Sequence, residues 1–401
     1  MAIATNGLSE KELTTALDDL FAEGEAGARD RESIAYDLEA GLTKKPLVLF
    51  GAGQLGRITL AGLRRLGVEP IAFIDNNSRL WKMKVDGVPV LSPQEAARIH
   101  GNQALFIVTI WRGKSADRMP EREATLRGLG CQHVITFQSL FWKHPEIFLP
   151  HYAVDLPHKV HQQADEVRRA GELWEDDASR GEYLAQLRWR MLGDFNAMPD
   201  PVEHTIYFPR ELCPLTDSEV FVDCGAYDGD SIQSFLEEAK NNFTHIYGFE
   251  PDPANFVKLK ETVSLLPKRD LISVRRAAVG ATPGIVTFSG EGSEASRVGT
   301  GDMEVECVVL DEILAGTRPT YIKMDIEGSE LEALTGARRI IERHSPVLAI
   351  CTYHLQNHLW KIPLLIRSFS DDYAFFLRPH LLEGWDLVTY AIPKHRLYRQ
   401  A

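Results

Sequence analysis

Two glycine-containing loops of opposite charge each follow an apolar run that is typical of a buried strand. The run 47–50 leads into Gly51-Ala52-Gly53-Gln54-Leu55-Gly56-Arg57, which contains no acidic residue. The run 220–223 ends at Asp223 and leads into a loop over 224–231, whose two glycines are surrounded by Asp223, Asp228 and Asp230. Ligands of open parallel sheets bind at the carboxyl ends of the strands, where such loops lie. The sequence therefore predicts two ligand sites with different chemistry.

The first loop is suited to a phosphate. Its glycines let a ligand approach the backbone closely, and Arg57 adds a positive charge beside a helix N-terminus. A second strand, over 70–74, ends at Asp75, which is placed to accept hydrogen bonds from a ribose. These features predict a nucleotide-type site formed by Gly51, Gly53, Gly56, Arg57 and Asp75. The alternative is a Rossmann-like scaffold without a ligand, in which Asp75 only caps the turn.

The second loop is unsuited to a phosphate because Asp223, Asp228 and Asp230 would repel it. S-adenosylmethionine carries an ammonium and a sulfonium and no phosphate, so it fits these carboxylates. Its ribose still requires an acidic acceptor after the second strand of the unit. Glu250, which follows the apolar run 245–249, is placed for that role.

Several ordered segments of the second half resemble the FkbM family of S-adenosylmethionine-dependent methyltransferases. The resemblance covers about residues 207–393, and the Lys-x-Asp-x-Glu-Gly segment is the most specific part of it. It implies a class I methyltransferase fold, with a seven-stranded, mostly parallel sheet and an antiparallel last strand. The family is associated with methyl transfer to hydroxyl oxygens of sugars, polyketides and related metabolites. The matching segments are 221–230, 248–253, 321–332 and Tyr353-His354.

The resemblance also implies where the cofactor lies. Asp223, Gly225 and Asp228 are expected near its methionine portion, Glu250 on the ribose, and Ala277 with Ala278 near the adenine. The complete set of cofactor-binding residues that we expect is Asp223, Gly225, Ala226, Asp228, Gly229, Glu250, Ala277, Ala278 and Asp325.

Methyl transfer to a neutral hydroxyl requires alignment of the acceptor oxygen and removal of its proton. His354 is the first candidate for the base, because it follows the apolar strand 347–351 and imidazole titrates near working pH. Tyr353 is expected to orient it. The alternative is that His354 is a hydrogen-bonded loop residue. We also expect the loop over 290–297 either to fold over the acceptor or to be a solvated hairpin connection.

Asp325 and Glu327 follow the fourth strand of the unit, and three interpretations of them stay open. Asp325 contacts the methionine ammonium or the acceptor, Glu327 caps the following helix, or both hold a divalent cation. A hard cation requires further oxygen ligands that the sequence does not place. We therefore predict no metal site and count Asp325 among the catalytic candidates.

The chain has 401 residues, more than one hydrophobic core usually accommodates. Strands and helices alternate in two series, with a helical stretch between them. This pattern predicts an α/β protein in which a class I methyltransferase domain follows a smaller Rossmann-like domain and a helical connector. The expected segments are a helical leader over 1–45, a nucleotide-binding-type domain over 46–140, a helical connector and loop over 141–214, and the methyltransferase domain over 215–401.

The composition excludes some partners. Asp and Glu number 57 against 44 for Lys and Arg, so the formal charge is -13, which repels nucleic acid and anionic lipid. The five cysteines are widely spaced and form no Cys-x-x-Cys pair. No secretory signal or membrane-spanning run is visible. These features predict a cytoplasmic protein without nucleic-acid or membrane partners.

The acceptor is expected to be a small molecule, either a saccharide or a secondary metabolite, or a nucleotide sugar bound through the first domain. Residues 51–77 and 87–92 look like the nucleotide-binding domain found ahead of some sugar-modifying acyltransferases. Two alternatives stay open. The chain is an NAD-dependent oxidoreductase that uses the 51–56 loop, or its first domain serves only for docking or as a homodimer interface.

Overall fold

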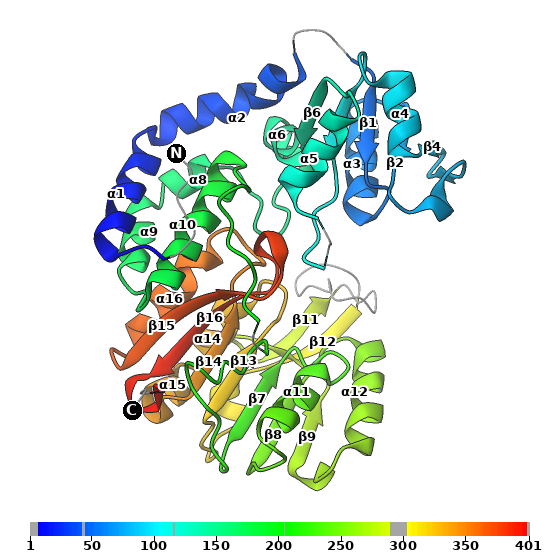
Figure 1. Ribbon diagram of the computed structural model, residues 1–401. Coiled ribbons are helices and arrows are strands. Elements are labelled where there is room, and N and C mark those ends of the chain that lie inside the picture. Colours follow the sequence, from blue (N-terminus) through cyan, green and yellow to red (C-terminus); the bar gives the residue numbers. More distant parts are fainter. Residues whose placement is uncertain (1–6, 42–44, 115–116, 204, 289–302, 399–401) are drawn as a thin grey trace.

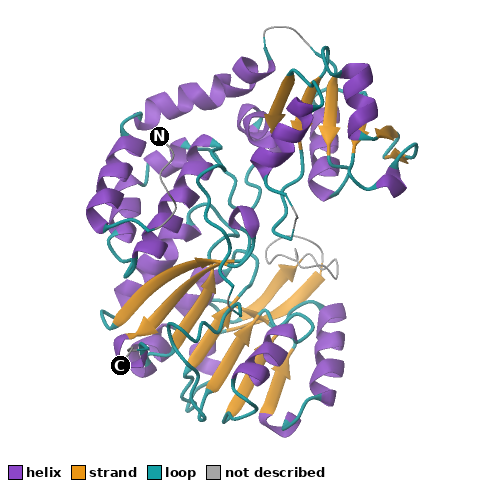
Figure 2. Ribbon diagram, viewed as in Figure 1, coloured by secondary structure: helices purple, strands orange, loops and turns teal. Residues whose placement is uncertain are grey.

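The computed structural model describes residues 7–41, 45–114, 117–203, 205–288 and 303–398. Two α/β units lie at opposite ends of the molecule, and a group of helices runs along one side between them (Figure 1). Each unit has helices on its sheet (Figure 2), as expected for alternating strands and helices. Across the described residues, no helix is both long and apolar enough to cross a membrane.

The N-terminal unit is built on a six-stranded sheet in the order β3-β4-β2-β1-β5-β6. All its pairs are parallel except the antiparallel pair of β3 and β4. The strands are β1 (Leu47–Phe50), β2 (Ala72–Ile74), β3 (Lys84–Val85), β4 (Val88–Leu91), β5 (Leu105–Val108) and β6 (His133–Thr136), and the helices are α3 (Gln54–Arg65), α4 (Pro93–His100), α5 (Met119–Gly128), α6 (Phe137–Lys143) and α7 (Pro145–Phe148).

Most of the helices between the units share a hydrophobic core with the C-terminal unit, whereas the second helix contributes Ala40 to the core of the N-terminal unit. The first helix has the capping box that its sequence predicts, with Ser9 and Glu12 bonded reciprocally. Its buried face contains Leu13, Leu17 and Phe21, which belong to the same core cluster as the C-terminal strands. These helices are α1 (Glu10–Phe21), α2 (Gly24–Ala40), α8 (His158–His161), α9 (Ala164–Gly171) and α10 (Asp177–Leu192).

The C-terminal unit contains a seven-stranded sheet in the order β15-β16-β14-β13-β7-β8-β9. Strand β16 is antiparallel to both of its neighbours, and the other pairs are parallel. This is the seven-stranded sheet with an antiparallel last strand that the resemblance implies. The strands are β7 (Val220–Cys224), β8 (His245–Phe249), β9 (Ile272–Arg275), β13 (Tyr321–Met324), β14 (Val347–Cys351), β15 (Tyr373–Pro379) and β16 (Leu387–Pro393).

Helices cover this sheet, and a smaller sheet of three strands in the order β10-β12-β11 lies beside it. The smaller sheet was not among the elements expected from the sequence. Its strands are β10 (Ala278–Val279), β11 (Gly284–Phe288) and β12 (Met303–Val308). The helices are α11 (Asp230–Glu238), α12 (Pro253–Leu265), α13 (Leu310–Ile313), α14 (Glu330–Gly336), α15 (Arg338–His344) and α16 (His358–Phe369).

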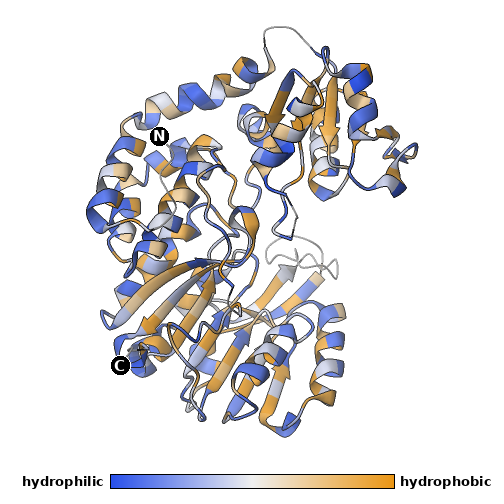
Figure 3. Cartoon of the chain, in the orientation of Figure 1, coloured by the Kyte–Doolittle hydropathy of each residue, from blue (hydrophilic) through white to orange (hydrophobic). Residues whose placement is uncertain are grey.

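The strand residues of both large sheets are mostly hydrophobic, whereas the outer helices carry much of the polar surface (Figure 3). Strands β1, β5, β13 and β14 have every residue buried. Such continuous apolar runs are typical of parallel strands covered on both faces.

The two units meet where the loop after β5 contacts the turn between β15 and β16. Trp111 packs against Trp385 with the rings tilted and their centroids 4.9 Å apart, and the Trp111 indole nitrogen donates to the carbonyl of Glu383. The fully buried guanidinium of Arg122 lies 2.9 Å from the carboxylate of Glu383. Trp111 follows the carboxyl end of β5. Trp385 precedes β16, and the start of this antiparallel strand lies beside the carboxyl end of β14. The carboxyl edges of both sheets therefore face this junction.

A buried carboxyl in α10 predicts a pH-dependent stability. Burial raises the pKa of Glu182 to about 7, against the charges of Arg190, Arg378 and Arg118. The folded protein therefore binds this proton more tightly than the unfolded chain, whose carboxyl has a pKa near 4.5. The stability should fall by roughly 3 kcal/mol as pH rises from about 4.5 to 7.

Urea unfolding of the wild type and of Glu182→Gln at pH 5 and 7.5 checks this prediction. The variant should lose less stability between the two pH values than the wild type. Glu261→Gln, at an exposed position of α12, is the matched control and should behave as the wild type. An identical pH dependence in the wild type and Glu182→Gln would contradict the assignment.

Candidate active site

The loops that follow β7 and β13 are in contact through a glycine. Gly225 has φ of 81°, and a Cβ atom there would lie 1.9 Å from the carbonyl oxygen of Asp325. Only glycine permits this approach and this backbone conformation. The acidic glycine loop and the Asp325 turn are therefore held side by side, at the carboxyl edge of the seven-stranded sheet.

Asp223 does not face a ligand; it is fully buried beneath the loop. Its Oδ1 lies 3.0 Å from Nζ of Lys323, and Ser231 donates its hydroxyl hydrogen to Oδ2. Lys323 also donates to the carbonyl of Gly225 at 2.6 Å. Burial raises the pKa of Asp223 and would lower that of Lys323, but Asp223 and other carboxylates raise the pKa of Lys323, and the two side chains lie at ion-pair distance. Asp223 thus supports the glycine loop through Lys323.

Glu250 lies at the end of β8, next to the same loop. Its Oε2 accepts from the amide of Tyr227 and its Oε1 from the amide of Asp252, both at 2.9 Å. The side chain is 6% exposed. Burial raises the pKa of Glu250 to about 7, although these amides and Lys323 act in the opposite direction.

The remaining cofactor candidates lie along the same edge. Ala226 is buried and its carbonyl accepts from the amide of Gly229, which begins α11 with φ of 94°. Asp228 is half-buried in this turn. Ala277 and Ala278 follow β9 and are both buried. The structure therefore brings the ends of β7, β8, β9 and β13 together, as the sequence predicts for a cofactor site.

Asp325 is the centre of a second cluster. Its Oδ2 accepts from the hydroxyl of Tyr207 at 2.8 Å, and its Oδ1 lies 3.4 Å from the hydroxyl of Tyr353 and 3.3 Å from Nε2 of His354. Its side chain is 24% exposed. Burial alone would raise the pKa of Asp325, but His354, Lys323 and Tyr207 lower it to about 2. The side chain is a fixed carboxylate.

His354 is fully buried behind Asp325. Its Nδ1 lies 2.8 Å from Oε1 of Glu330, and its Nε2 lies 3.8 Å from Oε1 of Glu327. Burial alone would lower the pKa of His354, but these carboxylates and Asp325 raise it well above its ordinary value. This differs from the expectation that the imidazole titrates near working pH. A protonated, buried ring has no lone pair with which to take a proton.

A buried carboxylate of α14 holds the turn after β13. The amides of Ile326 and Gly328 donate to Oε1 of Glu330. Among the residues that the structure describes, no group of three or more His, Cys, Asp or Glu side chains could hold a metal ion. The expected loop over 290–297 lies outside the described residues.

Three residues of this site were not among the predicted candidates: Tyr207, Lys323 and Glu330. The last two lie in the segment that carries the resemblance, and that segment was the available signal. Tyr207 precedes β7 and belongs to no motif. It has φ of 72°, which is strained for a tyrosine, and the hydroxyls of Tyr321 and Tyr390 hold its carbonyl and amide.

The glycine loop of the N-terminal unit has the expected close packing. A Cβ atom at Gly56 would lie 1.9 Å from the carbonyl oxygen of Gly51. Asp75 accepts from the amides of Ala52 at 2.9 Å and Asn77 at 2.8 Å, and Arg57 lies 3.3 Å from the carboxylate of Asp86. Gly53 begins α3. Asp75 thus caps the loop, and Arg57 has a carboxylate partner of its own.

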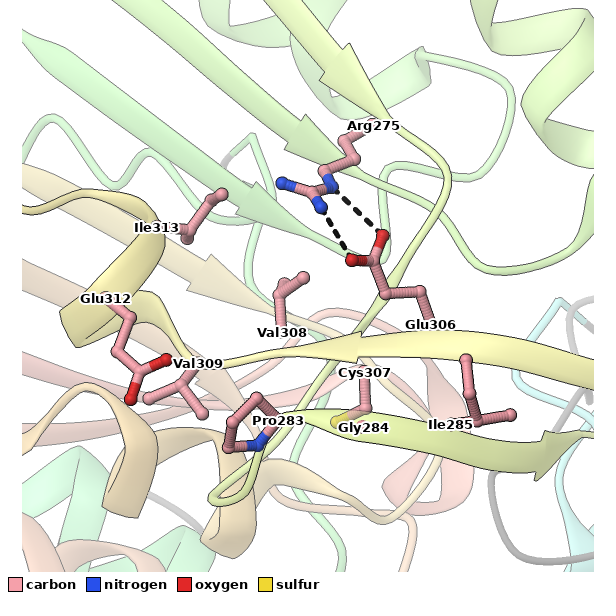
Figure 4. A pocket seen from close by; sticks show the side chains of 10 residues that line it. All are labelled: Arg275, Pro283, Gly284, Ile285, Glu306, Cys307, Val308, Val309, Glu312 and Ile313. Carbon is pink, nitrogen blue, oxygen red and sulfur yellow. Dashed lines mark hydrogen bonds and ion pairs between the residues drawn. The ribbon is translucent and has the colours of Figure 1, made fainter.

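A cavity of about 480 Å³ lies against β11, β12 and α13 (Figure 4). Arg275 and Glu306 form an ion pair at its wall. Among the residues that the structure describes, none of the predicted site residues lines it. We therefore place the candidate active site at the carboxyl edge and not in this cavity.

Comparison with known proteins identifies the type of domain that carries this edge. Residues 223–377 match the methyltransferase FkbM domain model. The crystal structure of methyltransferase FkbM from Methylobacillus flagellatus KT is similar over 98% of this chain and 100% of that chain, with 25% identity and a TM-score of 0.76. No curated protein matches the chain.

Two further structures are similar over less of the chain. Precorrin-6y C5,15-methyltransferase from Geobacter metallireducens matches 46% of this chain and 82% of that chain at 15% identity, with a TM-score of 0.26. The SAH-bound methyltransferase PaMTH1 from Podospora anserina matches 44% and 71% at 11% identity, with a TM-score of 0.27. With the family model and the full-length structural match together, the C-terminal unit of this chain is a methyltransferase FkbM domain.

Proposed function

We propose that the protein is an S-adenosylmethionine-dependent methyltransferase that acts on a hydroxyl oxygen of a small molecule, such as a saccharide or a secondary metabolite. The observation that carries this proposal is the carboxylate pair beside the Gly225 loop. Glu250 follows β8 and Asp325 follows β13, the two strands that flank β7, so both carboxylates lie beside the Gly225 loop, where a cationic, phosphate-free cofactor fits and a phosphate is repelled.

The chain's own residues account for each part of that cofactor. Glu250 retains lone pairs for the ribose hydroxyls besides the two amides it already accepts from. The backbone at Ala277 and Ala278 borders the adenine, and Gly225 with Asp228 borders the methionine portion. When bound, S-adenosylmethionine supplies an electrophilic methyl carbon on a sulfonium.

On the acceptor side, Asp325 is the exposed member of the catalytic candidates. We propose that its carboxylate receives the hydrogen bond of the acceptor hydroxyl. Tyr353 donates towards Oδ1 and fixes the direction of that carboxylate. His354 lies behind Asp325 and has no exposed surface, so it acts on the acceptor only through Asp325.

For the N-terminal unit we propose nucleotide binding at Gly51, Gly53 and Gly56, with a nucleotide sugar as one form of the acceptor. The shared orientation of the two carboxyl edges at the junction supports this proposal. The capping bonds of Asp75 support the alternative, a scaffold that serves docking. An NAD-dependent oxidoreductase would use the same loop.

Ligand-induced stabilisation separates these functions. A ligand that binds only the folded state, at a hundred times its Kd, raises stability by about 2.7 kcal/mol. S-adenosylhomocysteine should raise the Tm of the full chain, and NAD should not. A large shift with NAD and none with S-adenosylhomocysteine would reject the methyltransferase function in favour of the oxidoreductase.

Glu250 predicts how cofactor affinity depends on pH. The ionised carboxyl accepts hydrogen bonds from the ribose, so binding below pH 7 requires loss of a proton from a group with a pKa of about 7. The Kd for S-adenosylhomocysteine should therefore rise as pH falls below 7, by up to roughly tenfold per pH unit.

Isothermal titration calorimetry between pH 5.5 and 8.5 measures this dependence. Glu250→Gln should bind more weakly at pH 8 and lose the dependence, whereas Glu182→Gln, a buried acid in α10, should keep it. A wild-type Kd that is constant over this range would contradict the role of Glu250.

Asp325→Asn tests the acceptor side. The amide retains the size of the carboxylate but not its charge, so turnover should fall roughly 100-fold, the scale of one positioned polar group. Affinity for S-adenosylhomocysteine should change less than turnover. The assay follows transfer of labelled methyl from S-adenosylmethionine to a panel of hydroxylated saccharides and nucleotide sugars. An Asp325→Asn enzyme as fast as the wild type would remove Asp325 from the acceptor site.

A further inference from the structure

A buried carboxylate in α14 is the hub of the groups behind Asp325. Glu330 is fully buried, and its Oε1 accepts from the amides of Ile326 at 3.0 Å and Gly328 at 3.4 Å. The same oxygen lies 2.8 Å from Nδ1 of His354, and Oε2 lies 3.2 Å from Nδ1 of His358. One carboxylate thus joins the turn after β13 to the residues that follow β14.

His354 lies between this carboxylate and that of Asp325. One ring nitrogen faces Glu330 and the other lies 3.3 Å from Oδ1 of Asp325. A neutral imidazole has one N–H and one lone pair, so it would direct a lone pair at one of these carboxylates. The doubly protonated ring donates towards both. The geometry therefore favours an imidazolium between two anions.

We propose that Glu330 is a positioning residue of methyl transfer, which keeps His354 as an imidazolium and through it fixes the carboxylate of Asp325 at the crevice. The expected effect on turnover rests on the proposed function, whereas the charge state of His354 can be tested without a substrate. It also implies that His354 is not the base that removes the acceptor proton.

The carboxylates that face His354 all favour its protonated form. Asp325 and Glu327 approach it from the turn after β13, and Glu330 approaches from α14, with His358 of α16 behind Glu330. The ring of the neighbouring Tyr353 has its centroid 4.1 Å away. In the described part of the chain, the carboxylates of Asp325, Glu327 and Glu330 surround the ring and raise its pKa.

The first experiment observes the charge of His354 directly. In the full chain labelled with ¹⁵N-histidine, the His354 ring signals are assigned by their loss in His354→Asn. We expect both ring nitrogens of the wild type to stay protonated from pH 6 to 8. A neutral ring with one unprotonated nitrogen at pH 7 would overturn the proposal.

The variant Glu330→Gln removes the charge but keeps the size of the side chain. We expect His354 to lose its proton within that pH range in this variant. In Glu182→Gln, an equally buried acid in a different part of the fold, His354 should stay protonated. Retention of the imidazolium in Glu330→Gln would overturn the role of Glu330.

Should Glu330→Gln not fold, His358→Gln serves as the second variant. It leaves the contact between Glu330 and His354 in place, so the ring should stay doubly protonated. A neutral His354 in this variant would contradict Glu330 as the group that holds the charge.

Turnover of S-adenosylmethionine with an acceptor from the saccharide panel tests the positioning role. In Glu330→Gln, kcat should fall by roughly 10- to 100-fold, the scale of a misplaced reacting group. The fall should deepen with rising pH as His354 loses its charge, while the KM for S-adenosylmethionine changes less. A wild-type kcat and pH profile in the folded variant would reject the positioning role. If no acceptor in the panel is methylated, the proposed function fails, and the ring signals still decide the charge of His354.

Discussion

The ion pair of Lys323 with Asp223 is the interaction on which the candidate site depends. Lys323 belongs to β13 and Asp223 to the neighbouring strand β7, and both side chains are fully enclosed. Because Lys323 also donates to the carbonyl of Gly225, the same cation sets the shape of the glycine loop. Removal of one partner would leave an uncompensated buried charge, which typically destabilises a protein by about 3–5 kcal/mol.

The strands that carry this site were predictable because they are short, mostly apolar runs, with Lys323 as the exception in β13. The run Tyr321–Met324 and the run Val347–Cys351 have every residue buried, so periodicity and the following polar residues located their ends. Strand β11 is different, because Ile285 is 65% exposed and the strand pairs with β12 at the side of the main sheet. Its stability comes from tertiary pairing, which a local pattern does not contain.

The charge state of the site could not be predicted from the sequence, because it depends on distant contacts. His354 and Glu330 are separated by 24 positions, and Tyr207 and Asp325 by 118. A histidine after a strand is equally compatible with a base and with a buried cation. Only the position of Glu330 beneath the ring distinguishes them. The matching segments contain His354 and Glu330, and the packing of α14 against the turn determines what these two residues do.

A carboxylate that stays ionised favours methyl transfer when it lies beside the acceptor oxygen and not when it lies beside the sulfur. In methyl transfer from a sulfonium to a hydroxyl, positive charge moves from sulfur to the acceptor oxygen. An anion beside the sulfur would stabilise the ground state more than the transition state, whereas an anion beside the acceptor oxygen does the reverse. Asp325 has a pKa of about 2, so it stays ionised at neutral pH. Its negative charge therefore favours catalysis when the crevice directs it at the acceptor, with Tyr207 and His354 holding it from either side.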